Sequence, residues 1–305
     1  MKFRFSGHQT FAFRYGWLEK GVKAVAASSD IFSAEDAIVQ LGVGKNMVES
    51  IRHWCSVTQM LEESPVAGNE KKRVLSPSLL AKRLLLKEKS NPWDPFLEND
   101  ASLWLIHWLL ISNPIIGTSW QLAFGHFHRP DFSKRELVDF VKAHADKNSV
   151  RVNDSSLARD IDCLLRTYLP VRNGARTEAP EETFDCPLQE LGLIQTSPDG
   201  EFCRFAIGPK PTLPAPVFVF ALDEFFNRTK ADRNTLSVQE CLYGVQSPGQ
   251  AFKLDENSLV DYIESTEELT NGAITLDETA GLKQIYRRSK IDPLRLLHSY
   301  YQPKA

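Results

Sequence analysis

The sequence predicts a mainly α protein made of several winged-helix or helix-turn-helix modules with short β-hairpin wings. First, apolar residues recur at spacings of three and four along several segments, which is the pattern of amphipathic helices. Second, helix starts of the Ser-x-x-acid type occur at Ser33, Ser133 and Ser237. Third, turn-forming residues between short strand-like runs follow two of the helical stretches. Together these observations predict helices followed by a wing, a form that recurs without an exact sequence repeat.

The chain has 305 residues, enough for two or three domains. We divide it into four parts by the predicted elements and the changes in composition. These parts are an N-terminal winged helix-turn-helix module at 1–88, a helical linker region at 89–132, a second helical module with a hairpin at 133–208, and a C-terminal acidic helical module at 209–305.

The N-terminal module is predicted to contain two helices that meet at a tight turn. The first spans 33–41, where Ser33 and Asp36 form a variant capping box, and the second spans about 45–57. Gly42 and Gly44 separate them, as the turn between two crossing helices requires. The segments 58–62 and 71–76 are predicted to be strands around a turn at 64–69, which forms the wing.

The later segments predict further helices and a second hairpin. Trp104 and Trp108 lie four residues apart on one face of a helix over about 99–110, where we expect both to be buried. Capped helices are predicted from Ser133 to about 145 and from Asn153 or Asp154 to 168. Further predicted elements are a short helix at 188–193, a hairpin of 194–196 with 202–207, a buried helix at 217–226, and a helix that starts at Ser237.

Composition restricts the class of protein. Hydrophobic residues make up 42% and charged residues 25%, as in globular proteins. No apolar run has the length of a membrane span, and the first residues lack the features of a signal peptide, so we expect a cytoplasmic protein without a membrane partner. The five cysteines are scattered, contain no C-x-x-C motif, and are expected to be reduced.

The net charge of −3 is unevenly distributed. Residues 1–176 carry 24 Lys and Arg against 19 Asp and Glu, which gives +5. Residues 177–286 carry 7 against 19, which gives −12, and residues 287–305 carry 5 against 1, which gives +4. The basic N-terminal part therefore suits a polyanion, whereas the acidic part that follows repels one.

The predicted helix-turn-helix points to DNA as a partner. The second helix of such a motif places its N-terminal residues in the major groove, and a basic wing contacts the phosphate backbone. The candidate DNA-binding residues are Lys45, Asn46, Ser50, Arg52 and His53 on the helix, and Lys71, Lys72 and Arg73 on the wing. The alternative interpretation is a winged-helix scaffold that contacts only proteins.

Acidic residues are the candidates for metal-assisted cleavage of DNA. Phosphodiester cleavage commonly uses carboxylates that hold a divalent metal, here Mg or Mn. Asp94, Glu98 and Asp100 cluster around a loop and a helix start, and we predict all three as metal ligands and Asp94 and Glu98 as catalytic residues. The alternative is that Asp100 only caps the helix. Asp160 and Asp162 are two apart on a predicted helix, so they cannot share a metal, and salt bridges to Arg159 and Arg166 are expected.

Two histidines are assigned structural roles. His8 lies between aromatic residues, and we expect it to fix the N-terminal segment by a hydrogen bond. His107 lies on the helix of Trp104 and Trp108, where a hydrogen bond in the core is expected.

Several motifs resemble those of a known bacterial family catalogued as a domain of unknown function. It is the SspB-like family of DNA phosphorothioation-associated proteins, whose members occur beside DNA phosphorothioation genes. The resemblance covers most of the chain. It rests on FSGHQTF at 5–11, RYGWL at 14–18, LGVGKNMV at 41–48, Asp94-Pro95, LWLIHW at 103–108, LARDIDCLLRTY at 157–168 and PLQELGL at 187–193.

This resemblance implies a role in antiphage defence through DNA modification. It implies a DNA nicking endonuclease that makes single-strand breaks for sulfur incorporation, with a cysteine desulfurase and sulfur-transfer proteins as partners. It assigns no catalytic residues, and no nuclease motif is visible in the sequence. A non-catalytic DNA-binding adaptor of the modification complex is therefore the alternative.

Overall fold

Helices dominate the computed structural model, which describes residues 2–66, 69–87, 91–170, 186–229, 233–279 and 281–303. Four small sheets occur in these ranges, three of them antiparallel. The prediction of a mainly α protein is confirmed. In the described part of the chain, no helix is both long and apolar enough to cross a membrane.

The N-terminal elements form a helical group followed by a hairpin. They are β1 (Lys2–Phe3), α1 (Trp17–Ala27), η1 (Ile31–Ser33), α2 (Ala37–Leu41), α3 (Lys45–Val57), β2 (Leu61–Val66) and β3 (Asn69–Pro77). Gly42 ends α2 with φ of 61°, a left-handed conformation that favours glycine. The predicted helix at 45–57 is confirmed. A hairpin is present, but its first strand spans 61–66 rather than 58–62, so residues 64–66 of the predicted turn belong to a strand. The predicted helix start at Ser33 is wrong, because η1 ends there and α2 begins after Asp36.

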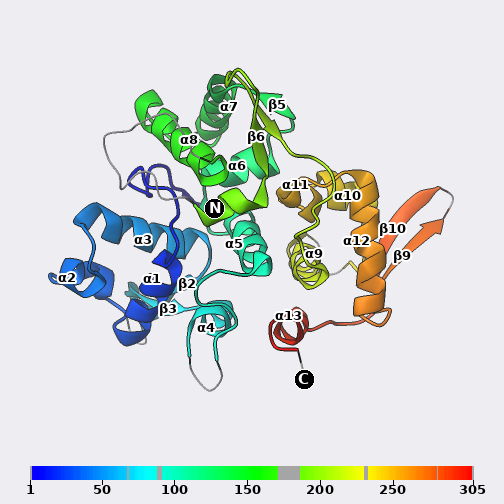
Figure 1. The fold of residues 1–305 in the computed structure, drawn as a ribbon, viewed down its shortest axis with the longest axis horizontal. Helices are drawn as coiled ribbons and strands as arrows, with labels where there is room; N and C mark the ends of the chain where they lie inside the picture. Colours follow the sequence, from blue (N-terminus) through cyan, green and yellow to red (C-terminus); the bar gives the residue numbers. More distant parts are fainter. Residues whose placement is uncertain are drawn as a thin grey trace.

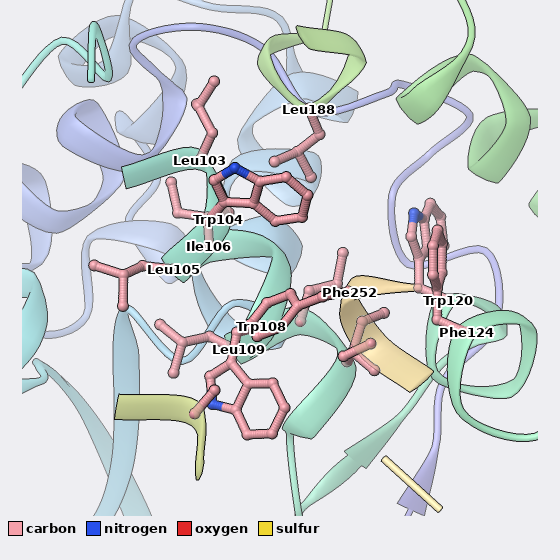
Figure 2. Packing of buried hydrophobic residues seen from close by; sticks show 14 of the residues in the cluster. Leu103, Trp104, Leu105, Ile106, Trp108, Leu109, Trp120, Phe124, Leu188 and Phe252 are labelled. Carbon is pink, nitrogen blue, oxygen red and sulfur yellow. The ribbon is translucent and has the colours of Figure 1, made fainter. Parts of the chain in front are cut away.

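A buried helix occupies the centre of the molecule. It is α5 (Asp100–Ser112), which follows α4 (Leu79–Leu85) and precedes β4 (Ile116–Gly117). All residues at 101–112 are buried, as expected of a helix that is apolar on every side. Trp104 and Trp108 are fully buried, as predicted, and their rings lie 5.6 and 5.7 Å from the ring of Phe252 (Figure 2).

Two groups of elements repeat one topology. The middle group contains α6 (Ser119–Gly125), β5 (Asp131–Phe132), α7 (Lys134–Lys147), α8 (Asp154–Tyr168), η3 (Pro187–Leu191), β6 (Ile194–Thr196) and β7 (Cys203–Phe205). The last group contains α9 (Ala215–Thr229), β8 (Thr235–Ser237), α10 (Val238–Tyr243), α11 (Pro248–Phe252), α12 (Glu256–Leu269), β9 (Ile274–Thr279) and β10 (Leu282–Arg287). Their sheets have the strand orders β5-β7-β6 and β8-β10-β9. In each sheet a short strand, β5 or β8, pairs with the second strand of the following hairpin, β7 or β10.

Helix α5 lies between the N-terminal elements and α9–α12, and α6–α8 lie above it in the view of Figure 1. The last helix, α13 (Pro293–Tyr301), packs against α9. It also reaches the segment before α5, because Tyr301 stacks on Trp93 at 5.1 Å. The capping boxes predicted at Ser133 and Ser237 are confirmed, as is the N-cap at Asn153.

Candidate nucleic-acid interface

The outer face of α3 exposes polar and basic side chains. Lys45, Asn46, Glu49 and Arg52 are exposed, whereas Val48, Ile51 and Trp54 on the opposite side are buried. Glu49 accepts a hydrogen bond of 2.5 Å from the side-chain nitrogen of Gln9. Three of the predicted DNA-binding residues, Lys45, Asn46 and Arg52, therefore share an accessible surface.

Two other predicted DNA-binding residues of α3, Ser50 and His53, are buried. The Ser50 hydroxyl donates to the carbonyl oxygen of His8 at 3.0 Å. His53 is 3% exposed and contacts the His8 ring. Burial, followed by the nearby His8 and Arg4, lowers the pKa of His53 well below its usual value. Both residues support the N-terminal loop and cannot reach DNA in this conformation.

The antiparallel hairpin β2–β3 lies in the region where the wing was predicted. Arg73 is exposed on β3, opposite Pro65 of β2. The pairing shifts its register between Pro65 and Val66, which is the kind of irregularity that bends a hairpin. Lys71 and Lys72 belong to β3, but their side chains lie outside the described part of the structure. Of the three predicted basic residues of this hairpin, Arg73 is the one that can be placed on the surface.

The loop at 6–10 has unusual backbone geometry. Ser6, Gln9 and Thr10 have φ values of 59°, 49° and 68°. These left-handed values are uncommon for residues other than glycine and unfavourable for a β-branched threonine. Such conformations persist where the surrounding structure imposes them, and they cluster at functional sites.

A buried His8–Asp160 pair imposes the conformation of this loop. The amide of Thr10 donates to His8 Nδ1 at 3.0 Å, so His8 Nε2 carries the proton and donates to Asp160 at 2.7 Å. Asp160 also accepts hydrogen bonds from the Ser6 amide at 2.6 Å and from the Ser119 hydroxyl. The role expected for His8 is confirmed. The pair joins the loop, and through Ser50 also α3, to α6 and α8.

The second acidic residue of α8 has a different environment. Asp162 pairs with Lys134 at 2.5 Å, and both side chains are 45% exposed. Among the described residues, Asp160 pairs with His8 and Asp162 with Lys134, so the prediction of salt bridges to Arg159 and Arg166 is wrong. Asp160 and Asp162 do not share a site, as predicted.

The predicted metal ligands Asp94, Glu98 and Asp100 are close in sequence but do not form a three-ligand group. Asp94 is 6% exposed and accepts hydrogen bonds from the amides of Glu98 and Asn99, each at 3.0 Å, and from the Ser102 hydroxyl at 2.5 Å. Glu98 and Asp100 are exposed. Asn99, not Asp100, caps α5.

This geometry does not fit a metal held by all three carboxylates, because the Asp94 oxygens already stabilise the start of α5. In the described ranges, no group of three or more His, Cys, Asp or Glu residues could hold a metal ion.

The histidine of α5 has the structural role that was predicted. His107 Nδ1 lies 2.7 Å from the Tyr168 hydroxyl, and Nε2 lies 2.8 Å from the carbonyl oxygen of Ala251. Burial lowers the pKa of His107 to about 3. It therefore stays neutral in the core.

The fold and this surface define a predominantly helical protein whose exposed α3 face carries basic residues next to the hydrogen-bonded loop at 6–10. Residues 5–301 match the family described as "Protein of unknown function (DUF4007)", and the chain belongs to this family. The resemblance found in the sequence motifs is confirmed.

Two solved structures are similar over 98% of this chain and 89% of theirs, each with a TM-score of 0.84. They are an SspB crystal structure, 29% identical, and a magnesium ion-bound SspB crystal structure, 30% identical. No curated protein matches the chain.

Proposed function

We propose that this protein is a DNA-binding component of a bacterial DNA phosphorothioation system, and that it engages DNA through α3 and the hairpin β2–β3. The observation that carries the proposal is the exposure of Lys45, Asn46 and Arg52 on α3, which follows α2 across the turn at Gly42. The similarity to SspB supports the assignment to phosphorothioation.

The local fold supports a winged helix-turn-helix at this place. Leu41 of α2 and Val48 of α3 are buried in one small cluster with Ala37, so the two helices pack across the Gly42 turn. The N-terminus of α3 then projects Lys45 and Asn46 outward, where a recognition helix contacts base edges and phosphates. The hairpin follows α3 directly and presents Arg73 for the DNA backbone.

The finer proposal is that this protein nicks DNA. The single-strand breaks would allow sulfur to be incorporated, and a cysteine desulfurase and sulfur-transfer proteins would supply that sulfur. The magnesium ion-bound SspB structure favours a divalent metal. Asp94 and Glu98 stay the proposed catalytic residues, and they can be separated experimentally. Asp94→Ala removes hydrogen bonds that fix the segment before α5. Glu98→Ala changes an exposed carboxylate and should abolish nicking without altering stability if Glu98 acts in cleavage.

Supercoiled plasmid distinguishes the candidate functions. A relaxed product that forms with magnesium and not in excess EDTA supports a nicking enzyme. A mobility shift without relaxation supports a DNA-binding adaptor. The absence of both contradicts the proposal and favours a scaffold that contacts only proteins.

Binding to duplex DNA tests the assigned surface. We expect the double variant Lys45→Ala, Arg52→Ala to bind about tenfold or more weakly, since such contacts contribute about 1–3 kcal/mol each. Arg135→Ala on α7 is the control, because this cation is 92% exposed and lies outside the proposed surface. Equal losses in both variants would contradict the assignment.

A further inference from the structure

A hollow of about 520 Å³ lies between the N-terminal loop and α8. Thr10 lines it on the loop side, and Arg159, Asp162, Leu165 and Arg166 line it on the helix side. Arg159 and Arg166 are seven residues apart, which is two helical turns, so both project from the same face of α8. None of these residues belongs to the α3 face or the wing described above.

The two arginines give this hollow a positive charge. The carboxylate of Asp162 is compensated by Lys134. Arg159 donates to the Ser155 carbonyl and the Ser156 hydroxyl, each at 3.3 Å, which are neutral acceptors.

Arg166 is incompletely paired. One terminal nitrogen donates to the Thr10 carbonyl at 2.6 Å, and its buried Nε has no hydrogen-bond partner among the described residues. A guanidinium group is well suited to a phosphate, because its planar fork matches two phosphate oxygens.

The hollow adjoins the outer face of α3. Arg166 contacts Thr10, and the preceding residue, Gln9, contacts Glu49 of α3. The loop that connects these contacts is joined to α8 by the His8–Asp160 pair, and its Gln9 and Thr10 have left-handed φ values. A helix in the major groove is flanked by the two phosphate backbones, so a phosphate site beside α3 lies where the DNA strand passes.

We propose that this hollow is a phosphate-binding subsite in which Arg159 and Arg166 hold one backbone phosphate of the DNA strand that α3 engages. The subsite rests on the proposed function. Within it, the His8–Asp160 pair is a positioning device that keeps Thr10 and Arg166 in place. The subsite would fix the orientation of the duplex on α3 without reading its sequence.

The test compares Arg159→Ala with Arg151→Ala, two exposed arginines of which only Arg159 lines the hollow. Duplex affinity is measured by fluorescence anisotropy over a range of salt concentrations. Loss of one phosphate contact should reduce the slope of log K against log salt by about 0.9 in Arg159→Ala and leave it unchanged in Arg151→Ala. Arg166→Lys should weaken binding at unchanged charge, because it removes the fork.

A scan of neutral methylphosphonates along the duplex locates the phosphate. One position is expected to weaken the wild type clearly and to weaken Arg159→Ala less, because only Arg166 then contacts that phosphate. Equal slopes for Arg159→Ala and Arg151→Ala, or no such position, would overturn the subsite while the loss in the α3 variants still upholds the proposed function. If the wild type does not bind DNA, both proposals are wrong.

Discussion

Replacing Asp160 by alanine tests the contacts that fix the N-terminal loop. The Asp160 side chain is 1% exposed and accepts from Ser6, His8 and Ser119. Alanine leaves these donors buried without a partner, and each unsatisfied donor costs about 1–3 kcal/mol. The donors are neighbours that can relax together, so we expect a total loss of about 3–5 kcal/mol, the range for a broken buried pair.

Asp162→Ala on the same helix is the matched control. Its ion pair with Lys134 is half-exposed, so its loss should cost less than about 1 kcal/mol. Urea unfolding followed by circular dichroism measures both free energies. If the two variants differ by less than about 1 kcal/mol, the buried pair does not fix the loop and our reasoning is wrong.

Three further predictions concern stability. Trp108→Ala should lower the free energy of unfolding by about 3–5 kcal/mol, because the indole is fully buried and donates to Glu224 at 2.6 Å; a melting temperature equal to that of the wild type would contradict this. The free energy of unfolding should fall as pH drops from about 6.5 to 3, because His107 takes up a proton in the unfolded chain in this window and stays neutral when buried. Denaturation at several pH values should show a slope of the unfolding free energy against pH that is shallower by about 1.4 kcal/mol per pH unit in His107→Gln. Asp94→Ala should lower the melting temperature, because it removes the hydrogen bonds from the amides of Glu98 and Asn99, whereas Glu98→Ala should melt like the wild type; equal melting temperatures would show that these hydrogen bonds do not stabilise the start of α5.

Local sequence rules predicted many elements correctly. The caps at Ser133, Asn153 and Ser237 and the helix at 45–57 depend on contacts within a few residues, so they can be found from the sequence. The start at Ser33 failed although it satisfies a similar pattern. There the chain forms the short η1 instead and α2 begins only after Asp36, a difference that the capping pattern alone does not reveal.

The candidate interface was only partly predictable, because local patterns do not show which segments from elsewhere in the chain cover a helix. The helical periodicity placed Lys45, Asn46 and Arg52 outside, and they are exposed. Ser50 and His53 are buried because the N-terminal loop covers that side of α3, and no periodicity within α3 indicates such a cover. His8 and Asp160 are separated by 152 residues, so their pairing depends on the tertiary fold.

The salt dependence of DNA affinity tests most directly whether the N-terminal surface binds DNA. Each phosphate contact contributes about 0.9 to the slope of log K against log salt. We therefore predict that the triple variant Lys45→Ala, Arg52→Ala, Arg73→Ala reduces the slope of the wild type by up to about three units, whereas Arg135→Ala leaves it unchanged. A triple variant with the slope of the wild type would contradict the account.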